Sequence, residues 1–286
     1  MDEYVKSNKA LWNDWTLINA RSADYDLEGF KQHKNSLHPL ELGEVGDVSG
    51  KSLLHLQCHF GKDTLSWAQL GANVTGVDFS ENAIDLARSL SAELEIPANF
   101  VLSDLYRLPE VLEGEFDIVF TSYGVLGWLP DIELWGKIVA HYLKPGGTFY
   151  IAEVHPFVWI FDDSGEPADL KVIYSYFHKE PLRFDVKGSY ADPDADYVGV
   201  EYGWNHTLSD YINALIGAGL QIEHLHEFPF LGWKALPFME EHEDGLWYLP
   251  EGKDKIPLLF SLKATKPKDI DTSGPAVESG SEFFAG

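Results

Sequence analysis

From residue 51 onward, short apolar runs alternate with longer stretches in which apolar residues recur every three or four positions. Apolar runs of about four to eight residues are typical of buried strands, whereas the longer periodic stretches are typical of amphipathic helices. Strands are predicted at residues 51–57, 73–77, 99–102, 116–120 and 148–154, and helices at about 62–70, 81–94 and 131–143. This order forms βαβ units, so the pattern predicts a doubly wound, Rossmann-like α/β sheet with helices on both faces.

The alternation of strand and helix patterns is absent on both sides of this region. Residues 1–50 contain apolar and aromatic positions at helical spacing and are expected to form a helical, aromatic cap. Residues 155–205 are rich in aromatic residues, Pro and Asp, and are expected to form a lid insertion above the sheet. A helix at 208–218 and strands at 220–227 and 257–264 complete a domain over residues 51–265. Residues 266–286 are small and polar and are expected to be a flexible tail.

The charge of the chain narrows its expected partners. Acidic residues outnumber basic ones by 46 to 21, which gives a formal charge of −25. Such a surface repels phosphate backbones and anionic lipids, so neither nucleic acid nor membrane is expected as a partner.

Targeting signals and cysteine content help to predict the cellular compartment. No apolar run reaches the roughly 20 residues needed to span a bilayer, and the first residues lack the basic and apolar regions of a signal peptide. Cys58 is the single cysteine, so no intrachain disulfide can form. We expect a cytoplasmic protein that is a monomer or a homodimer.

The candidate ligand site follows the first predicted strand. Ligands of doubly wound sheets bind beyond the carboxyl ends of the strands, and an acid about 20 residues after the first loop binds ribose hydroxyls. Residues 55–61 read HLQCHFG, and Asp78 ends the next strand. Gln57 and His59 stand where a dinucleotide-binding loop has its first two glycines, so their side chains would crowd a pyrophosphate. Because Asp78 and Asp104 add negative charge, the site favours a cationic nucleoside, S-adenosylmethionine, over a nicotinamide dinucleotide.

Five segments carry a family resemblance. In order, they are LLHLQCHFG, GVDFS, SDLYRLP, FDIVFTSYGVLGWLPD and LKPGGTFYIAEVHP. Together they resemble the class I (Rossmann-like) S-adenosylmethionine-dependent methyltransferases, specifically the bacterial and archaeal group that acts on small molecules. The resemblance departs from the family in the first loop, where His55 replaces the usual acid. It implies a sheet of seven strands, mostly parallel with an antiparallel last strand.

The resemblance also implies which residues bind the cofactor. The first loop would hold the methionine part, Asp78 the ribose, and Asp104 with Leu105 the adenine, while residues 121–123 would line the methyl face. An N-terminal aromatic segment folded over the sulfonium would add cation–π attraction. The expected cofactor-binding residues are Trp15, His55, Gln57, Cys58, His59, Gly61, Asp78, Phe79, Ser80, Asp104, Leu105, Thr121 and Ser122.

Methyl transfer to an oxygen or nitrogen of a small-molecule acceptor also needs a base. His155 follows the fifth predicted strand, at the rim where the acceptor is expected, and imidazole has a near-neutral pKa. Glu153 precedes it by two residues and is expected to orient His155 or raise its pKa, because both side chains leave an extended chain on the same side. Tyr123 is the third catalytic candidate, expected at the pocket wall.

Other readings of the sequence stay open at this point. One is a non-catalytic protein that binds S-adenosylmethionine or S-adenosylhomocysteine, and another is a nicotinamide oxidoreductase on the same fold. No metal is expected, because His55, Cys58 and His59 have no fourth ligand or carboxylate near them in the sequence. His224 and His226 alternate on one predicted strand, where solvent exposure or ordinary hydrogen bonding is expected.

Overall fold

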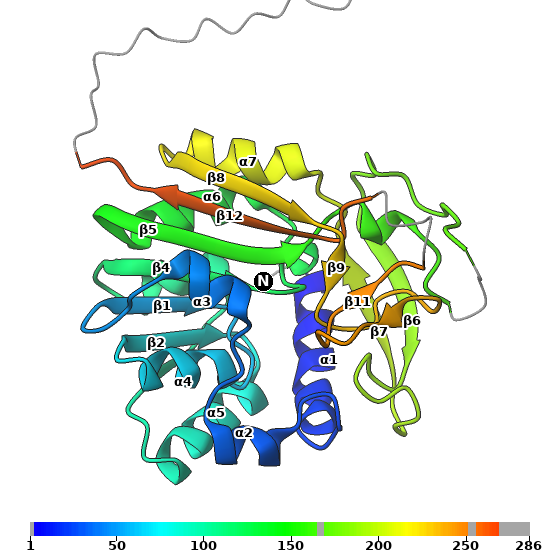
Figure 1. Cartoon of the computed structure of the whole chain (residues 1–286), viewed down its shortest axis with the longest axis horizontal. Helices are drawn as coiled ribbons and strands as arrows, with labels where there is room; N and C mark the ends of the chain where they lie inside the picture. The colour runs from blue at the N-terminus through cyan, green and yellow to red at the C-terminus, as the bar shows by residue number, and fades with distance from the viewer. Residues whose placement is uncertain (1–2, 165–168, 251–255, 269–286) are drawn as a thin grey trace, which may run out of the picture.

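The central element of the structure is a seven-stranded sheet (Figure 1). The computed structural model describes residues 3–164, 169–250 and 256–268. The strands lie in the order β3-β2-β1-β4-β5-β12-β8. Their bounds are β1 (Ser52–Leu56), β2 (Asn73–Asp78), β3 (Asn99–Leu102), β4 (Phe116–Ser122), β5 (Leu143–Val154), β8 (Gln221–Phe228) and β12 (Leu259–Thr265).

The direction of the strands matches the expected topology. β12, the last strand in the chain, runs antiparallel to both of its neighbours, β5 and β8. The other neighbouring strands pair in parallel. The predicted fold class, a mostly parallel seven-stranded sheet with an antiparallel last strand, is therefore confirmed.

Helices cover both faces of the sheet. One face carries α3 (Pro39–Val45), α4 (Lys62–Gln69) and α5 (Glu81–Glu93), and the other carries α6 (Ile132–Tyr142), α7 (Leu208–Gly217) and the 3-10 helix η1 (Leu105–Glu110). Ser80 caps α5, since its hydroxyl accepts a hydrogen bond from the Ala83 amide at 3.1 Å.

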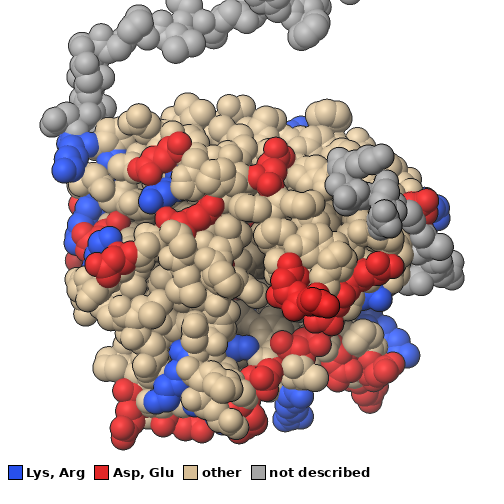
Figure 2. Space-filling view, in the orientation of Figure 1, with Lys and Arg blue, Asp and Glu red and all other residues tan. Residues whose placement is uncertain are grey.

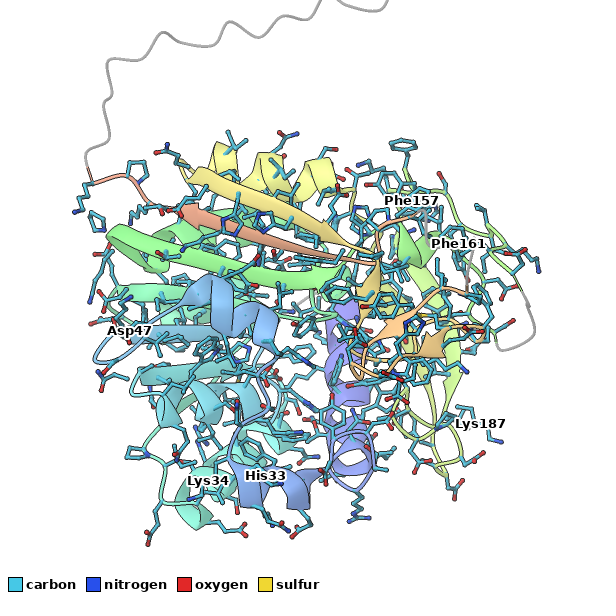
Figure 3. All side chains as sticks on the ribbon, in the orientation of Figure 1. His33, Lys34, Asp47, Phe157, Phe161 and Lys187 are labelled. Carbon is cyan, nitrogen blue, oxygen red and sulfur yellow. The ribbon has the colours of Figure 1, made fainter. Side chains whose placement is uncertain are left out.

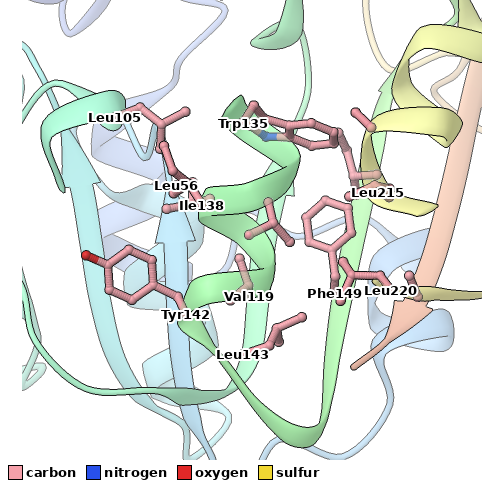
Figure 4. Close-up of a cluster of buried hydrophobic side chains, with 14 of the residues drawn as sticks. Leu56, Leu105, Val119, Trp135, Ile138, Tyr142, Leu143, Phe149, Leu215 and Leu220 are labelled. Atoms are coloured by element: carbon pink, nitrogen blue, oxygen red, sulfur yellow. The ribbon is translucent and has the colours of Figure 1, made fainter. Parts of the chain in front are cut away.

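The largest hydrophobic cluster lies between the sheet and the pair α6 and α7 (Figure 4). Trp135 of α6 is fully buried and meets Phe149 of β5 edge to face, with ring centroids 5.6 Å apart. The indole nitrogen of Trp135 has no hydrogen-bond partner among the described residues. The contribution of Trp135 to stability therefore comes from apolar packing.

The segments outside the sheet gather beyond the carboxyl ends of its strands (Figure 1). They include α1 (Glu3–Asn19) and the antiparallel hairpin of β6 (Leu182–Lys187) and β7 (Val198–Gly203), whereas α2 (Leu27–His33) packs against α4 and α5. A second small sheet joins β9 (Phe230–Leu231), β10 (Glu240–Glu241) and β11 (Trp247–Tyr248). Short 3-10 helices, η2 (Leu126–Trp128) and η3 (Val158–Ile160), complete this layer.

The layer beyond the strand ends has an apolar core of its own. Phe157 and Phe161 pack edge to face at 5.6 Å and lie on the side of the molecule beyond the strand ends (Figure 3). The β6–β7 hairpin was not predicted, although Leu182, Phe184 and Val186 alternate with charged residues at the spacing of a half-buried strand.

Two expectations from the sequence concern membrane-spanning segments and the C-terminal tail. No helix within the described residues is long and apolar enough to cross a membrane. Of the expected tail, residues 269–286 lie outside the described part of the chain.

The packing of Trp135 leads to a prediction. Trp135→Ala removes a buried ring and should lower the free energy of unfolding by about 3–5 kcal/mol. Trp135→Phe keeps most of the apolar contact and removes an unpaired N–H group, so its cost should be less than half as large. Urea denaturation of both variants measures the difference, and equal losses would contradict this account of the packing.

Candidate active site

The carboxyl ends of β1, β2, β4 and β5 meet at one edge of the sheet, and α1 lies across from them (Figure 1). The face of the molecule shown in Figure 2 is hollowed near its middle, with acidic side chains along the rim of the hollow. The predicted site residues leave the sheet at this edge. The site is therefore built from strand ends on one side and from α1 on the other.

The first loop turns the chain from β1 into α4 through three left-handed residues. Gln57, His59 and Gly61 have φ angles of 56°, 50° and 78°. A left-handed conformation costs a residue with a side chain about 1 kcal/mol or more, which is why glycine usually occupies such positions. A side chain at Gly61 would lie 2.6 Å from the ring of Phe100. The loop thus has the backbone of a glycine-rich loop but carries two polar side chains on it.

Asp78, at the end of β2, fixes this loop. Its carboxylate accepts hydrogen bonds from the amides of His59 and Ser80, each at 2.9 Å. Asp78 is 9% exposed, and burial raises its pKa to about 6. Because the folded chain holds this proton above the usual pKa of 3.8, the contribution of Asp78 to stability falls as pH rises from 3.8 to about 6. Additional hydrogen-bond donors on the carboxylate would favour its ionised form.

Aromatic side chains from distant parts of the chain meet over the first loop. The ring of Trp12 lies 5.3 Å from His59 and 5.1 Å from Trp128, edge to face in both cases. Trp15 is buried, lies 6.1 Å from Trp128 and donates its indole N–H to the carbonyl of Gly188 at 2.8 Å. Tyr190 lies against both tryptophans of α1. We call Trp12, Trp15, Trp128 and Tyr190 the aromatic wall.

The polar residues of α1 reach the same place. The hydroxyl of Ser80 donates to Asn13 at 2.7 Å, and Thr16 lies 3.3 Å from the imidazole of His59. Burial lowers the pKa of His59 to about 3, so its ring is neutral. The structure thus brings the predicted residues Trp15, His59 and Ser80 together, while their contact with a cofactor stays a prediction.

A buried polar network lies behind the loop. His55 contacts Thr64 at 2.8 Å and Ser122 at 3.4 Å, and burial lowers its pKa to about 4, so it is neutral. Ser122 donates to a carboxylate oxygen of Asp63 at 3.1 Å. Asp63, in the first turn of α4, thus brings a carboxylate into this network. Sequence reasoning missed Asp63, although its place two residues after Gly61 was a usable signal.

The remaining predicted cofactor residues lie along the same edge. Asp104 caps η1 by accepting a hydrogen bond from the Tyr106 amide at 2.8 Å, and Leu105 is buried. The Cys58 thiol is buried, which raises its pKa and keeps it protonated. Thr121 is buried within β4, and Phe79 follows Asp78 directly. The link from the Ser103 amide to the Asp78 carbonyl, at 2.9 Å, joins the Asp104 turn to the end of β2.

Glu153 holds the loop that follows β4. Its buried carboxylate accepts backbone hydrogen bonds from Gly124 at 2.5 Å, Val125 at 2.8 Å, Leu126 at 3.1 Å and Val154 at 2.7 Å. Burial raises the pKa of Glu153. The same loop contacts the first loop, because Gln57 donates its side-chain amide to the Val125 carbonyl at 3.1 Å. Glu153 therefore acts on the shape of the site.

The expected pairing of Glu153 with His155 is wrong. Antiparallel pairing of β5, β12 and β8 brings Glu227 to His155 instead, with Oε1 3.0 Å from Nε2, although the two are not aligned as a hydrogen bond. Nδ1 of His155 accepts a hydrogen bond from the Phe157 amide at 3.2 Å. Burial lowers the pKa of His155. In the neutral ring Nε2 then carries the proton, so neither nitrogen has a bare lone pair to act as a base.

Tyr123 has a partner that the sequence did not indicate. Its hydroxyl donates to Oε2 of the buried Glu41 at 2.8 Å, and Oε1 of Glu41 accepts a hydrogen bond from the His38 amide at 2.8 Å. Burial raises the pKa of both Tyr123 and Glu41. The ring of Trp233 lies 5.7 Å from that of Tyr123, edge to face. These residues form a second cluster beside the end of β4.

Comparison with known proteins agrees with this fold. Residues 54–151 match the family model of a methyltransferase domain. Among solved structures, the chain is similar to an S-adenosylmethionine-dependent methyltransferase from Mesorhizobium loti, with a TM-score of 0.52 and 24% identity over 79% of this chain and 96% of that one. It is also similar to an S-adenosylmethionine-dependent methyltransferase from Clostridium acetobutylicum, with a TM-score of 0.55 and 13% identity over 90% of this chain and 99% of that one. These two structures show the fold.

Residues 54–151 thus match a methyltransferase domain, and the predicted resemblance to S-adenosylmethionine-dependent methyltransferases is confirmed. Among curated proteins, the chain is 31% identical over 159 residues to the demethylmenaquinone methyltransferase of Lactococcus lactis subsp. lactis (strain IL1403). The aligned region covers 52% of this chain and 62% of that protein. It is 30% identical over 135 residues to the ubiquinone biosynthesis O-methyltransferase of Photorhabdus laumondii subsp. laumondii, covering 46% and 56%. The matches therefore span less than two thirds of either relative.

The four hydrogen bonds of Glu153 can be tested by one substitution. Glu153→Gln places amide hydrogens against backbone N–H donors and should lower the free energy of unfolding by about 1–3 kcal/mol. Glu227→Gln is the matched control, because Glu227 is half exposed and its loss should cost less than about 1 kcal/mol. Thermal unfolding followed by circular dichroism compares the two. Equal stability of Glu153→Gln and the wild type would contradict the role assigned to Glu153.

Proposed function

We propose that the chain is an enzyme that transfers a methyl group from S-adenosylmethionine to an oxygen or nitrogen of a small molecule. The observation that carries this proposal is the first loop: left-handed backbone at Gln57, His59 and Gly61, fixed by Asp78 at the end of the next strand. That arrangement offers a nucleoside its ribose-binding acid. The two side chains on the loop oppose a pyrophosphate, which disfavours the oxidoreductase alternative.

The residues at this edge fit S-adenosylmethionine. Oε1 of Gln57 is buried and has no hydrogen-bond partner among the described residues, so it can accept from a donor such as an amino group. Asp78 can accept ribose hydroxyls in addition to its two amides. The π faces of Trp12 and Trp128 favour a cation beside the first loop. When bound, the cofactor supplies an activated methyl group on a sulfonium.

We assign the following roles to residues of the chain. Asp78 binds the ribose, Gln57 and Asp63 bind the amino group, and Asp104 with Leu105 and Phe79 encloses the adenine. The aromatic wall excludes water from the reacting centre and fixes the direction of attack. Because neither the loop nor α1 has to form new secondary structure for this, the site is preorganised.

We propose that the methyl acceptor binds beside Tyr123. Its hydroxyl can accept the acceptor's proton at Oη while it donates its own to Oε2 of Glu41. Burial raises the pKa of Glu41, which makes this carboxylate a better proton acceptor than an exposed one. Trp233 and His38 border the ring of Tyr123 and favour a flat, aromatic acceptor. The prediction that His155 is the base stays open. The tautomer of its ring, which leaves neither nitrogen with a bare lone pair, argues against it.

The nature of the acceptor and the setting of the reaction belong to the same proposal. The relatives are named for menaquinone and ubiquinone pathways, so phenolic compounds are the first acceptors to screen. We propose that the protein works in the cytoplasm as a monomer or homodimer, without nucleic acid or membrane as a partner. The single cysteine and the charge of −25 support this setting.

Ligand-dependent stability tests the cofactor assignment. S-adenosylmethionine and S-adenosylhomocysteine should raise the melting temperature, and at 100 times Kd either ligand adds about 2.7 kcal/mol of stability. NAD and NADP should leave it unchanged. Asp78→Ala should abolish most of the shift because the ribose hydroxyls lose a charged acceptor. Equal stabilisation by NAD would refute the assignment, and binding without methyl transfer to any screened phenol or amine would favour the non-catalytic alternative.

The pKa of Asp78 predicts how binding depends on pH. Ribose hydroxyls favour the ionised carboxylate, so affinity for S-adenosylhomocysteine should be constant above pH 7 and fall below about pH 6. A change of one pH unit below the pKa changes affinity up to about tenfold. Isothermal titration calorimetry between pH 5 and 8 measures the profile. Asp78→Asn is the control, and a pH step that persists in that variant would assign it to another group.

A pair of substitutions separates the two candidates for proton transfer. Tyr123→Phe keeps the ring and should lower kcat by about 10²–10⁴ with little effect on affinity for S-adenosylhomocysteine. His155→Gln should change kcat less than about tenfold, because its ring offers no bare nitrogen. Steady-state kinetics with an acceptor found in the screen makes the comparison. The opposite order of effects would assign the base to His155.

A further inference from the structure

A cluster of potential metal ligands lies outside the proposed methyltransferase site. Glu44 comes from α3, and His224 and His226 come from β8. One ligand atom from each of the three side chains lies within 4.8 Å of the others. We propose that Glu44, His224 and His226 bind a divalent transition-metal ion, with Zn²⁺ as the best match to the ligands.

The two histidines lie close to each other and to Glu44. They alternate on β8, so their side chains leave the strand on the same face. Their rings stack, with centroids 4.4 Å apart and planes 13° from parallel. Nδ1 of His226 lies 2.7 Å from Oε1 of Glu44, and Nε2 of His224 lies 3.8 Å from Oε2. The three ligand atoms therefore lie close together, and the two rings would turn out of their stacked arrangement to direct both lone pairs at one ion.

His224 provides an observation that ordinary hydrogen bonding leaves unexplained. Its Nε2 atom is buried and has no hydrogen-bond partner in the part of the chain that the structure describes. A neutral imidazole keeps a lone pair on one ring nitrogen, and metal binding uses that lone pair. A bound cation would satisfy this atom.

The set of ligands selects the kind of ion. Imidazole nitrogens suit zinc, copper, iron and nickel, and a combination of two histidines with one glutamate occurs in zinc sites with an open fourth position. Bonds of about 2.0–2.2 Å to one ion place ligand atoms about 3.4 Å apart. The present separations from Glu44, 2.7 Å and 3.8 Å, lie on both sides of that value, so ion binding requires rotation of the imidazole side chains and no movement of the strand. The side chain of His226 is 50% exposed, which gives an ion and a water molecule access.

Neighbouring groups hold the carboxylate in place. The hydroxyl of Tyr150 donates to Oε2 of Glu44 at 2.9 Å, the kind of contact that orients a metal-binding carboxylate. Lys263 faces the cluster from β12, but its ammonium donates to the backbone carbonyl of Glu44 at 3.3 Å and lies 3.9 Å from Glu223. With Glu44 and Glu223 against one lysine, the local charge favours a cation.

Metal binding here would join α3 to the edge strand of the sheet. The same helix carries Glu41, which accepts the hydrogen bond from Tyr123. The cluster is nevertheless separate from the proposed cofactor residues, because it uses none of them. The inference therefore does not depend on methyltransferase activity.

Direct titration of the full chain tests the site. Protein freed of metal with a chelator is titrated with ZnCl₂ by calorimetry, and with CoCl₂ while the visible absorption that reports ligand geometry is recorded. We expect one ion per chain. His224→Asn/His226→Asn and, separately, Glu44→Gln should weaken the affinity about 100-fold or more. The matched control is His33→Asn/His141→Asn, which changes two exposed histidines outside the cluster and should leave the affinity unchanged.

Circular dichroism of each variant in chelator establishes that it is folded, and the single substitution His226→Asn replaces the double one if folding fails. Absence of Zn²⁺ binding in the wild type would overturn the proposal and leave a hydrogen-bonded cluster. Equal affinity in the wild type and in either cluster variant would overturn it as well. These outcomes are distinct from failure of the proposed function, which is measured with S-adenosylhomocysteine.

Discussion

The rest of the site depends on the contact between the Asp78 carboxylate and the amide of His59. The chain has to pass from β1 into α4 within a few residues, and it does so through left-handed backbone at Gln57 and His59. These conformations are unfavourable for residues with side chains, so something else has to hold them. Asp78 does this from the end of β2, and its burial raises its own pKa as a consequence. The first loop, Asp78 and the end of β2 therefore hold one another in place.

A second carboxylate extends this unit across the sheet. Glu153 gathers the amides of the loop after β4, and Gln57 connects that loop to the first one through Val125. Trp128 in the same region meets Trp12 of α1. The two sides of the candidate cofactor site are thus positioned by buried carboxylates that carry no catalytic function in our account. This explains why a loop without its usual glycines keeps the shape of a nucleotide-binding loop.

Prediction from the sequence succeeded where the signal is local. Hydrophobic periodicity located the strands and helices of the sheet, and the position of Asp78 after a buried strand indicated its place at the site. It failed where partners come from distant segments. The pairing of His155 with Glu227 depends on the antiparallel insertion of β12, and the bond between Tyr123 and Glu41 depends on how α3 packs. Neither contact can be inferred from the spacing of residues in the sequence.

The most direct test of the central claim is native mass spectrometry of the chain with S-adenosylhomocysteine and NAD present at equal concentration. We expect one adduct per chain with the mass of S-adenosylhomocysteine and none with that of NAD, because the side chains of Gln57 and His59 crowd a pyrophosphate. Replacing both by glycine should reduce this discrimination. An NAD adduct on the wild type, at equal or greater abundance, would contradict the account.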